Sequence, residues 1–516
     1  MLAMKKMISK KNPARFGLIM ILIFSGLTSC TERWEEMNNN PNSLTDLPDE
    51  YLFTSAVRGA FNDAMGDIQV NFGGQYAHIY ISNNWVREID KYNGYGTQDY
   101  PEMVFNGVYN SSIRNAVEVL HLTSEGEKYE NRWHNAQAQM VAIISFSKLT
   151  DMFGDVPYSE GGMAKYGIEE PKYDTQEEIY ADMVDRLANC ISVLEEPGAE
   201  THMYASNVDP IYKGDLDKWI RFANTYRFHL AMRARFADPP KYEAIITECL
   251  SLPLIESNDQ NPTLETSESK SDLYNPWYWQ WQSSQEGVYN LVWADKFIST
   301  LIETNDPRLS FFASKNPEEQ YVGMPNGLTD EAFSSWNKKN ASVPSGSFFA
   351  KDQPIYLLTA AQICLLRAEA ALFNLNGASG DANTMYQTAI ELAMEQWSIE
   401  EDSIAAYLAD EAEATLYGDQ ENRFRQISTQ MWIASVPNAF ESWCTIRRTG
   451  YPEIPRRTDP QLSPGITDGF MPTRVSYPFT KELTINGENL NEAISRLPGG
   501  EDKIDTKLWW DARDTP

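Results

Sequence analysis

The stretch IYLLTAAQICLLRAEAALF, residues 355–373, carries apolar side chains on nearly every side when it is drawn as a helix. It contains no Gly and no Pro, and it is long enough for about five helical turns. A helix that is hydrophobic all round is packed on more than one side, whereas a surface helix keeps one polar face. We therefore predict a buried helix over residues 355–373, inside a body built mainly of helices.

The next stretch predicts a second helix that packs on the first. Its apolar residues recur every three or four positions, at Tyr386, Ala389, Ile390, Ala393, Met394 and Trp397. The small Ala side chains allow two helix backbones to approach closely. Helix, short loop and helix with Tyr and Ala at these spacings resemble a tetratricopeptide pair, although the strict period of about 34 residues that marks a regular solenoid is absent.

Two earlier stretches show the same helical period. Thr175 and Glu178 form a capping-box signature. The apolar residues that follow share one face, namely Ile179, Met183, Leu187, Cys190, Ile191 and Leu194. A second apolar face begins after Asp215, and we expect that helix to end at Asp238, because Pro239 follows. Arg227 interrupts this face, and since a buried Arg needs a carboxylate or carbonyl partner, we predict a structural ion pair there.

Residues 251–350 differ from these helical blocks. Helical periodicity weakens there, while Pro, Gly, Ser and Asn become more frequent. We interpret the segment as irregular structure inserted between two helical blocks. Loops on a rigid scaffold are where binding residues usually lie, so this segment is the first place to look for a site.

The N-terminus has the pattern of an export signal. Five basic residues precede an apolar run over residues 16–27, which spans roughly 18 Å as a helix and is too short for the roughly 30 Å hydrocarbon layer. A cleaved signal peptide over residues 1–29 is the better interpretation. Leu27-Thr28-Ser29-Cys30 resembles a bacterial lipobox, in which the Cys thiol is acylated; the alternative is an ordinary signal peptide with a chance Cys. Residues 30–50 are polar, and we expect them to tether the lipid to a body over residues 51–516.

Composition narrows the function classes. The chain carries 73 acidic against 43 basic residues, a formal net charge of −30. It should repel nucleic acid, because phosphate binding depends on clustered Lys and Arg; a solvated acidic surface is the simplest meaning of the charge. After acylation of Cys30, the remaining cysteines are Cys190, Cys249, Cys364 and Cys444, with no Cys-x-x-Cys pair. We expect buried free thiols, although export would also permit disulfides. No motif indicates a cofactor, and the sequence leaves open whether Ca²⁺ is bound.

Several short phrases are spread over most of the chain. They are DMFGDVPY at 151–158, WIRFANT at 219–225 with LAMR at 230–233, ISTQMWI at 427–433, FESW at 440–443, RRTGYP at 447–452 and TKLWWD at 506–511. Their number and order, behind a lipobox, resemble the SusD/RagB family, the lipoproteins that cap TonB-dependent transporters in glycan uptake. One departure concerns local loop geometry: the family commonly has Tyr-Pro-x-x-Glu-x-x-x-Asn, whereas here Tyr477-Pro478 is followed by Glu482 and Asn486, one residue late.

The resemblance implies an all-α body with four tetratricopeptide-like helix pairs and long irregular loops that form a ligand surface. It also implies a lipid-anchored, surface-exposed outer-membrane protein that is not an enzyme. Such a protein captures oligosaccharide, closes like a lid over a SusC-like TonB-dependent transporter and delivers the cargo. Capture of peptide or another nutrient is the alternative, and a structural module whose sole partner is the transporter is a third interpretation. His-Glu-x-x-His, Gly-x-Ser-x-Gly and phosphate-loop motifs are missing, although the many acidic residues leave room for a glycosidase pair.

The richest candidate for sugar binding is segment 274–297, in which eight of 24 residues are aromatic against 12% of the whole chain. Sugar rings stack their C–H faces on aromatic rings and offer hydroxyls to amides. Trp277, Trp279 and Trp281 alternate, so in an extended segment they would share one face. Tyr278 and Tyr289 complete this candidate set. Packing of these rings in the core or against the transporter is the alternative and the more frequent role of aromatic clusters.

Asn84 and Trp85 are a second candidate, with Arg87 close by. Family members known to bind sugar often place a stacking aromatic in a loop after an N-terminal helix, and Trp85 is the nearest match here. A core Trp is the alternative at this position. We expect structural roles for the tryptophans that belong to family phrases and helical stripes, namely Trp219, Trp443, Trp509 and Trp510.

Overall fold

The computed structural model of the protein describes residues 47–62, 65–82, 87–94, 99–285, 291–459 and 466–513. The predicted signal peptide, Cys30 and most of the predicted tether lie outside the described residues. From Asp49 onward the described residues belong to one compact unit, Asp49–Pro516. None of the helices in the described ranges combines the length and the apolar character that a membrane crossing requires.

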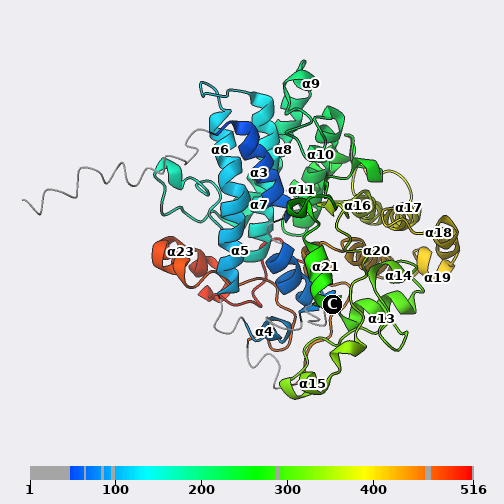
Figure 1. Ribbon diagram of the computed structural model, residues 1–516. Coiled ribbons are helices and arrows are strands. Elements are labelled where there is room, and N and C mark those ends of the chain that lie inside the picture. Colours follow the sequence, from blue (N-terminus) through cyan, green and yellow to red (C-terminus); the bar gives the residue numbers. More distant parts are fainter. Residues whose placement is uncertain are drawn as a thin grey trace, which may run out of the picture. The chain divides into compact units, whose positions relative to one another are not determined.

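Helices make up most of this unit (Figure 1). The first part of the chain contributes α3 (Asp49–Asn62), the π-helix η1 (Met65–Gly74), α4 (Arg87–Asp90), α5 (Tyr100–Val108), η2 (Tyr109–Ile113), α6 (Arg114–Leu122), α7 (Arg132–Phe153), η3 (Ala164–Tyr166), α8 (Gln176–Leu194), α9 (Ala199–His202), α10 (Leu216–Ala234) and α11 (Pro239–Leu250). Neighbours along the chain pack side by side, as Figure 1 shows for α6, α7 and α8: α6 on α7, α7 on α8, α8 on α10, and α10 on α11.

The second part begins with short elements and ends with longer helices. It contributes η4 (Asn258–Gln260), β2 (Thr263–Leu264), η5 (Ser271–Leu273), α12 (Trp277–Gln285), β3 (Leu291–Trp293), α13 (Asp295–Glu303), α14 (Leu309–Phe312), α15 (Asp330–Ser335), η6 (Lys338–Asn340), β4 (Ile355–Tyr356), α16 (Ala360–Leu372), α17 (Ala382–Glu395), α18 (Glu401–Leu408), α19 (Glu411–Ala414), α20 (Gln420–Ala434), α21 (Ala439–Thr449), α22 (Lys481–Ile485), α23 (Gly487–Arg496) and η7 (Pro498–Gly500). Helix α16 packs on α17 and α20, α20 on α21, and α10 on α16. The predicted all-α, tetratricopeptide-like scaffold is confirmed.

Two small antiparallel sheets join distant parts of the chain. β1 (Tyr80–Ser82) pairs with β3, with Tyr80 opposite Trp293 and Ser82 opposite Leu291. β2 pairs with β4. The first of these sheets supports the start of α12, where the candidate aromatic residues lie.

Helix α8 agrees closely with its prediction. Thr175 and Glu178 form the capping box, and the apolar face from Ile179 to Leu194 is buried. Helix α10 begins after Asp215 as expected but ends at Ala234, four residues earlier than predicted. Asp238 instead caps α11, because its side chain accepts a hydrogen bond from the Lys241 N–H, and Pro239 suits the first turn of a new helix.

The helix predicted over residues 355–373 begins later in the chain than expected. Thr359 and Gln362 form a capping box, so α16 starts at Ala360. The residues before it are used in β4 instead, because β-branched and aromatic side chains suit a strand that has a partner. The prediction that this helix is buried on more than one side is confirmed, since most of α16 is buried.

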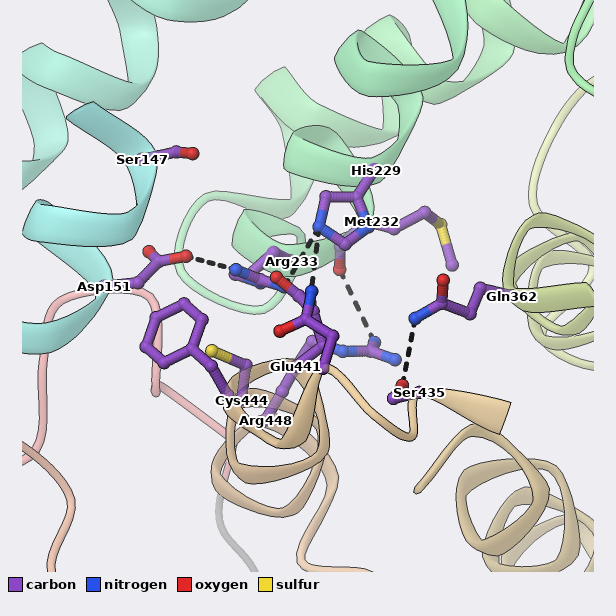
Figure 2. Close-up of polar contacts among 12 residues, drawn as sticks. Ser147, Asp151, His229, Met232, Arg233, Gln362, Ser435, Glu441, Cys444 and Arg448 are labelled. Carbon is purple, nitrogen blue, oxygen red and sulfur yellow. Dashed lines mark hydrogen bonds and ion pairs between the residues drawn. The ribbon is translucent and has the colours of Figure 1, made fainter. Parts of the chain in front are cut away.

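A buried ion-pair network lies where α7, α10 and α21 meet (Figure 2). The Arg233 guanidinium on α10 pairs with Asp151 on α7 and with Glu441 on α21. His229 Nε2 lies 3.0 Å from Arg233 Nη2. Burial, with added effects of Arg233 and Arg448, lowers the pKa of His229 well below its usual value, so the neutral ring accepts a hydrogen bond from the guanidinium.

A second part of this network is centred on Glu369 of α16. Its carboxylate lies 2.8 Å from Arg235 Nη2 and 2.6 Å from Arg448 Nη2. Burial alone would raise the pKa of Glu369, but the guanidinium groups of Arg448 and Arg235 outweigh that effect and lower the pKa to about 2. The carboxylate is therefore ionised in the folded protein at neutral pH.

The cysteines and Arg227 occupy the places predicted for them. The four cysteines of the described residues are free and buried. Burial raises the pKa of the Cys190 and Cys444 thiols to about 12, which leaves them unreactive at neutral pH. Arg227 pairs with Glu248 at 2.8 Å and donates to the Val184 carbonyl at 3.1 Å, so the expected ion pair is confirmed.

Replacing Glu369 by Gln should lower the free energy of unfolding at neutral pH by roughly 3–5 kcal/mol, because two buried guanidinium groups lose their carboxylate. A group whose pKa is lowered by folding stabilises the protein above its ordinary value of 4.5, and this contribution disappears as the pH falls toward about 2. Urea denaturation of wild type and Glu369→Gln should show a difference that shrinks over that interval.

The matched control is Glu453→Gln, which removes the carboxylate of a surface pair with Arg425 at 3.0 Å. Exposed pairs contribute about 1 kcal/mol or less, so this change should be nearly neutral. Equal losses in the two variants, or a loss at Glu369 that is independent of pH, would contradict the role assigned to the buried carboxylate.

Candidate functional site

The aromatic segment folds as a helix and not as an extended strand. α12 begins at Trp277, where the Asn275 side chain accepts a hydrogen bond from the Trp277 N–H at 3.1 Å. A helix turns by about 100° per residue, so Trp277 and Trp281 lie on one face and Trp279 points to another. The three tryptophans would share a face in an extended segment, and that condition is not met, because the segment is helical.

Trp277 belongs to the core. It is 2% exposed, and its ring stacks on Phe349 with centroids 4.9 Å apart. Tyr80 of β1 lies 5.5 Å from it on the supporting sheet. Of the two roles considered for the candidate aromatics, core packing applies to Trp277, and this packing fixes the start of α12.

Four other rings form a surface, the aromatic platform, composed of Tyr274, Tyr278, Trp279 and Trp281. Trp279 is 51% exposed, and its ring centroid lies 5.8 Å from that of Tyr274 and 5.5 Å from that of Tyr278. Trp281 is partly buried against Gly346, where an added Cβ would come within 3.1 Å of the Trp281 ring. The platform is thus held in place by Trp281 and open to solvent at Trp279.

A cation borders the aromatic platform. Lys351 Nζ lies 4.8 Å from the ring centroids of both Tyr274 and Tyr278. The Lys351 carbonyl accepts a hydrogen bond from the Asn275 N–H at 2.8 Å, which joins this segment to the start of α12. Sequence reasoning missed Lys351, because no spacing rule connects residue 351 with a helix that begins at residue 277.

A small crevice opens beside α12 and is lined by Trp277, Gln69 and Asn438 among others. Gln69 Nε2 donates to Asn438 Oδ1 at 2.8 Å, and Gln69 Oε1 accepts from the Phe440 N–H at 2.8 Å. These polar atoms are therefore occupied within the protein. Because a sugar needs both an open ring face and available polar partners, the aromatic platform suits it better than the crevice.

The remaining candidates, Asn84, Trp85 and Tyr289, lie outside the described residues. The residues that flank their segments are described: Ser82 of β1 and Leu291 of β3 are register partners.

The histidines take part in the protein's own contacts. His78 Nε2 lies 3.0 Å from the Tyr92 hydroxyl, and His134 Nδ1 lies 2.9 Å from Asp49 Oδ2. Burial, with smaller effects of Arg457 and Lys296, lowers the pKa of His78 well below its usual value. Over the described ranges, no group of three or more His, Cys, Asp or Glu side chains is placed to hold a metal ion.

Comparisons with known proteins agree with this architecture. Residues 41–478 match a family model described as "Starch-binding associating with outer membrane". A chitin-binding protein of known structure shares 26% identity and a TM-score of 0.77, over 90% of this chain and 100% of that one. A SusD homologue from Bacteroides uniformis shares 27% identity and a TM-score of 0.77, over 90% and 99% of the two chains.

A more distant relative has the same fold. A chitin-binding SusD homologue from Flavobacterium johnsoniae shares 21% identity and a TM-score of 0.78, over 90% of this chain and 99% of that one. No curated protein matches the chain significantly. At 21% identity, the likeness to the Flavobacterium johnsoniae protein concerns the fold alone.

Substitutions on the two faces of α12 should have unequal effects on stability. Trp277→Ala removes a buried ring and should lower the free energy of unfolding by roughly 3–5 kcal/mol. Trp279→Ala removes a ring that is half exposed and should change it by less than about 1 kcal/mol. Thermal and urea denaturation of the two variants would measure this contrast, and a large loss at Trp279 would mean that its ring is a packing residue.

Proposed function

The chain belongs to the SusD-like family, and from this premise we propose that it is a cell-surface lipoprotein that captures oligosaccharide and delivers it to a TonB-dependent transporter of the outer membrane. The family model covers most of the chain, and its description names starch binding and association with the outer membrane. The relative at 26% identity is named as chitin-binding. Both descriptions support a glycan as the cargo of this protein.

The observation that carries the proposal is the exposed ring of Trp279 on the aromatic platform. A large apolar side chain left half exposed next to other rings is typical of a binding surface. Aromatic rings stack on the C–H faces of sugars, and the Lys351 ammonium beside Tyr274 and Tyr278 supplies a polar group next to the stacking ring. In the proposed role the protein binds glycan without chemical change.

Attachment to the outer membrane is proposed to depend on Cys30. Acyl chains on this residue would hold the protein at the surface, while residues 30–50 give it freedom to move over the transporter. The full chain carries a formal net charge of −30, which disfavours electrostatic binding to an anionic lipid surface. A lipid anchor and a protein partner together would supply that association.

Purified protein should bind an oligosaccharide in a glycan array and in calorimetry. Trp279→Ala should weaken binding roughly tenfold, since loss of ring stacking removes about 1 kcal/mol or more. Incubation should generate no new reducing ends, which separates binding from hydrolysis. A blank glycan array combined with binding of peptides would assign the same scaffold a different cargo.

Tyr417→Ala is the matched control, because Tyr417 is an aromatic residue outside the aromatic platform and is 59% exposed. Its affinity for the same glycan should equal that of the wild type. If Trp279→Ala binds as tightly as this control, the aromatic platform is not the binding surface, whatever the cargo is.

Cys30→Ser should release the protein from the outer-membrane fraction, because the thiol that carries the lipid is lost. Cell fractionation followed by mass spectrometry of the N-terminal peptide measures this directly. The wild-type peptide should carry the mass of a diacylglyceryl group and an acyl chain. An unmodified Cys30 in membrane-associated protein would disprove the proposed anchor and leave glycan binding untouched.

A further inference from the structure

We propose that the aromatic platform selects glycans that carry a negative charge, with Lys351 as the residue that pairs with the anionic group. The inference rests on the proposed function and narrows its ligand class to sugars with a carboxylate or a sulfate ester. It arises from the position of one cation among the described residues, which neither the family description nor the relatives assign.

Lys351 is held beside the stacking surface by its neighbours. Its ammonium lies over two rings of the aromatic platform, 4.8 Å from the centroid of Tyr274 and 4.8 Å from that of Tyr278. Those two rings are also the ones nearest to Trp279. The stacking ring and the cation therefore share the same pair of tyrosines, and a sugar on Trp279 brings its substituents close to the ammonium.

The charge of Lys351 has no counter-charge within the described part of the protein. Some lysines make ion pairs there, such as Lys213 with Glu265 at 2.7 Å and Lys91 with Asp330 at 2.8 Å. Lys351 makes none in the same ranges; its partners are the side chains of Tyr274 and Tyr278. In a chain with 73 acidic and 43 basic residues, a cation left without a carboxylate at a candidate binding surface leaves that position to an anion from the ligand.

The surroundings also keep this group charged. Desolvation acts to lower the pKa of Lys351, but the electrostatic effects of Tyr274 and Tyr278 outweigh it and raise the pKa. The ammonium is therefore fully protonated at neutral pH. Ring contacts and side-chain hydrogen bonds to Tyr274 and Tyr278 orient the ammonium without supplying a carboxylate, so it can still pair with a carboxylate or sulfate of a ligand.

The test uses glycans in pairs that differ in charge alone. Oligogalacturonate and its fully methyl-esterified form of the same length form one pair, and a sulfated carrageenan oligosaccharide with its fully desulfated, uncharged form is another. The charged member of at least one pair should bind more tightly in calorimetry. Raising NaCl from about 0.05 M to about 0.5 M should reduce that preference, because salt screens a partly exposed ion pair.

Lys351→Met should lower affinity for the charged glycan roughly two- to fivefold, which is the range for a partly exposed ion pair, and leave affinity for the uncharged partner unchanged. Lys351→Arg should restore most of the loss. Lys213→Met is the control, since it removes a lysine that already has a carboxylate partner outside the aromatic platform. Equal melting temperatures would show that all three variants are folded.

The outcomes separate this inference from the proposed function. Glycans that bind with no preference for charge, or a charge preference that survives in Lys351→Met, would overturn the inference and leave glycan capture standing. Failure of every glycan, charged or neutral, would instead disprove the proposed function. Loss of the preference in Lys351→Met alone, with neutral binding intact, is the expected result.

Discussion

The structure depends on the pairing of one buried cation, Arg233, with two carboxylates. Removing a guanidinium from water is unfavourable by several kcal/mol unless charges and hydrogen bonds surround it. Asp151 and Glu441 supply the charges, and neutral His229 supplies an acceptor (Figure 2). These residues come from α7, α10 and α21, so three helices that are far apart in the sequence have to meet at this point if the charge is to be buried at all.

The same constraint explains why short phrases far apart in the sequence could be recognised together. Asp151 begins the first phrase, Arg233 ends LAMR, Glu441 lies in FESW, and Trp510 of the last phrase lies 5.8 Å from the Arg233 guanidinium. Arg447 of RRTGYP donates to the Asp151 carbonyl at 2.6 Å. Residues that satisfy one buried network cannot vary independently of one another, whereas the exposed residues between them can. The phrases therefore predicted the fold far better than any single helix pattern did.

Local rules predicted elements well where a side chain acts on its own backbone. The Thr175–Glu178 box began α8 at the expected residue, and the free buried thiols and the Arg227 ion pair followed from apolar spacing. They failed where tertiary partners decide, as for Ile355, which pairs with Leu264 in a strand rather than extending α16. In α12 the sequence was ambiguous, because Trp277 and Trp281 are four residues apart and fit a helix as well as an alternating strand. Lys351 could not be found at all, since its place beside Tyr274 arises from long-range folding.

The arrangement of α12 suits a ring that is kept for contact with a ligand. Full burial of a large apolar side chain contributes about 1.5–3 kcal/mol, and Trp279, which is 51% exposed, forgoes part of this, so it contributes less to folding than Trp277. Trp277 is fixed in the core and Trp281 is held against Gly346, and the short helix between them holds Trp279 in place. A ligand that covers this ring recovers the unburied area without having to order a loop first, which reduces the entropy lost on binding. The buried Trp277 and the partly buried Trp281 therefore fix the position of the exposed Trp279 ring that would contact a ligand.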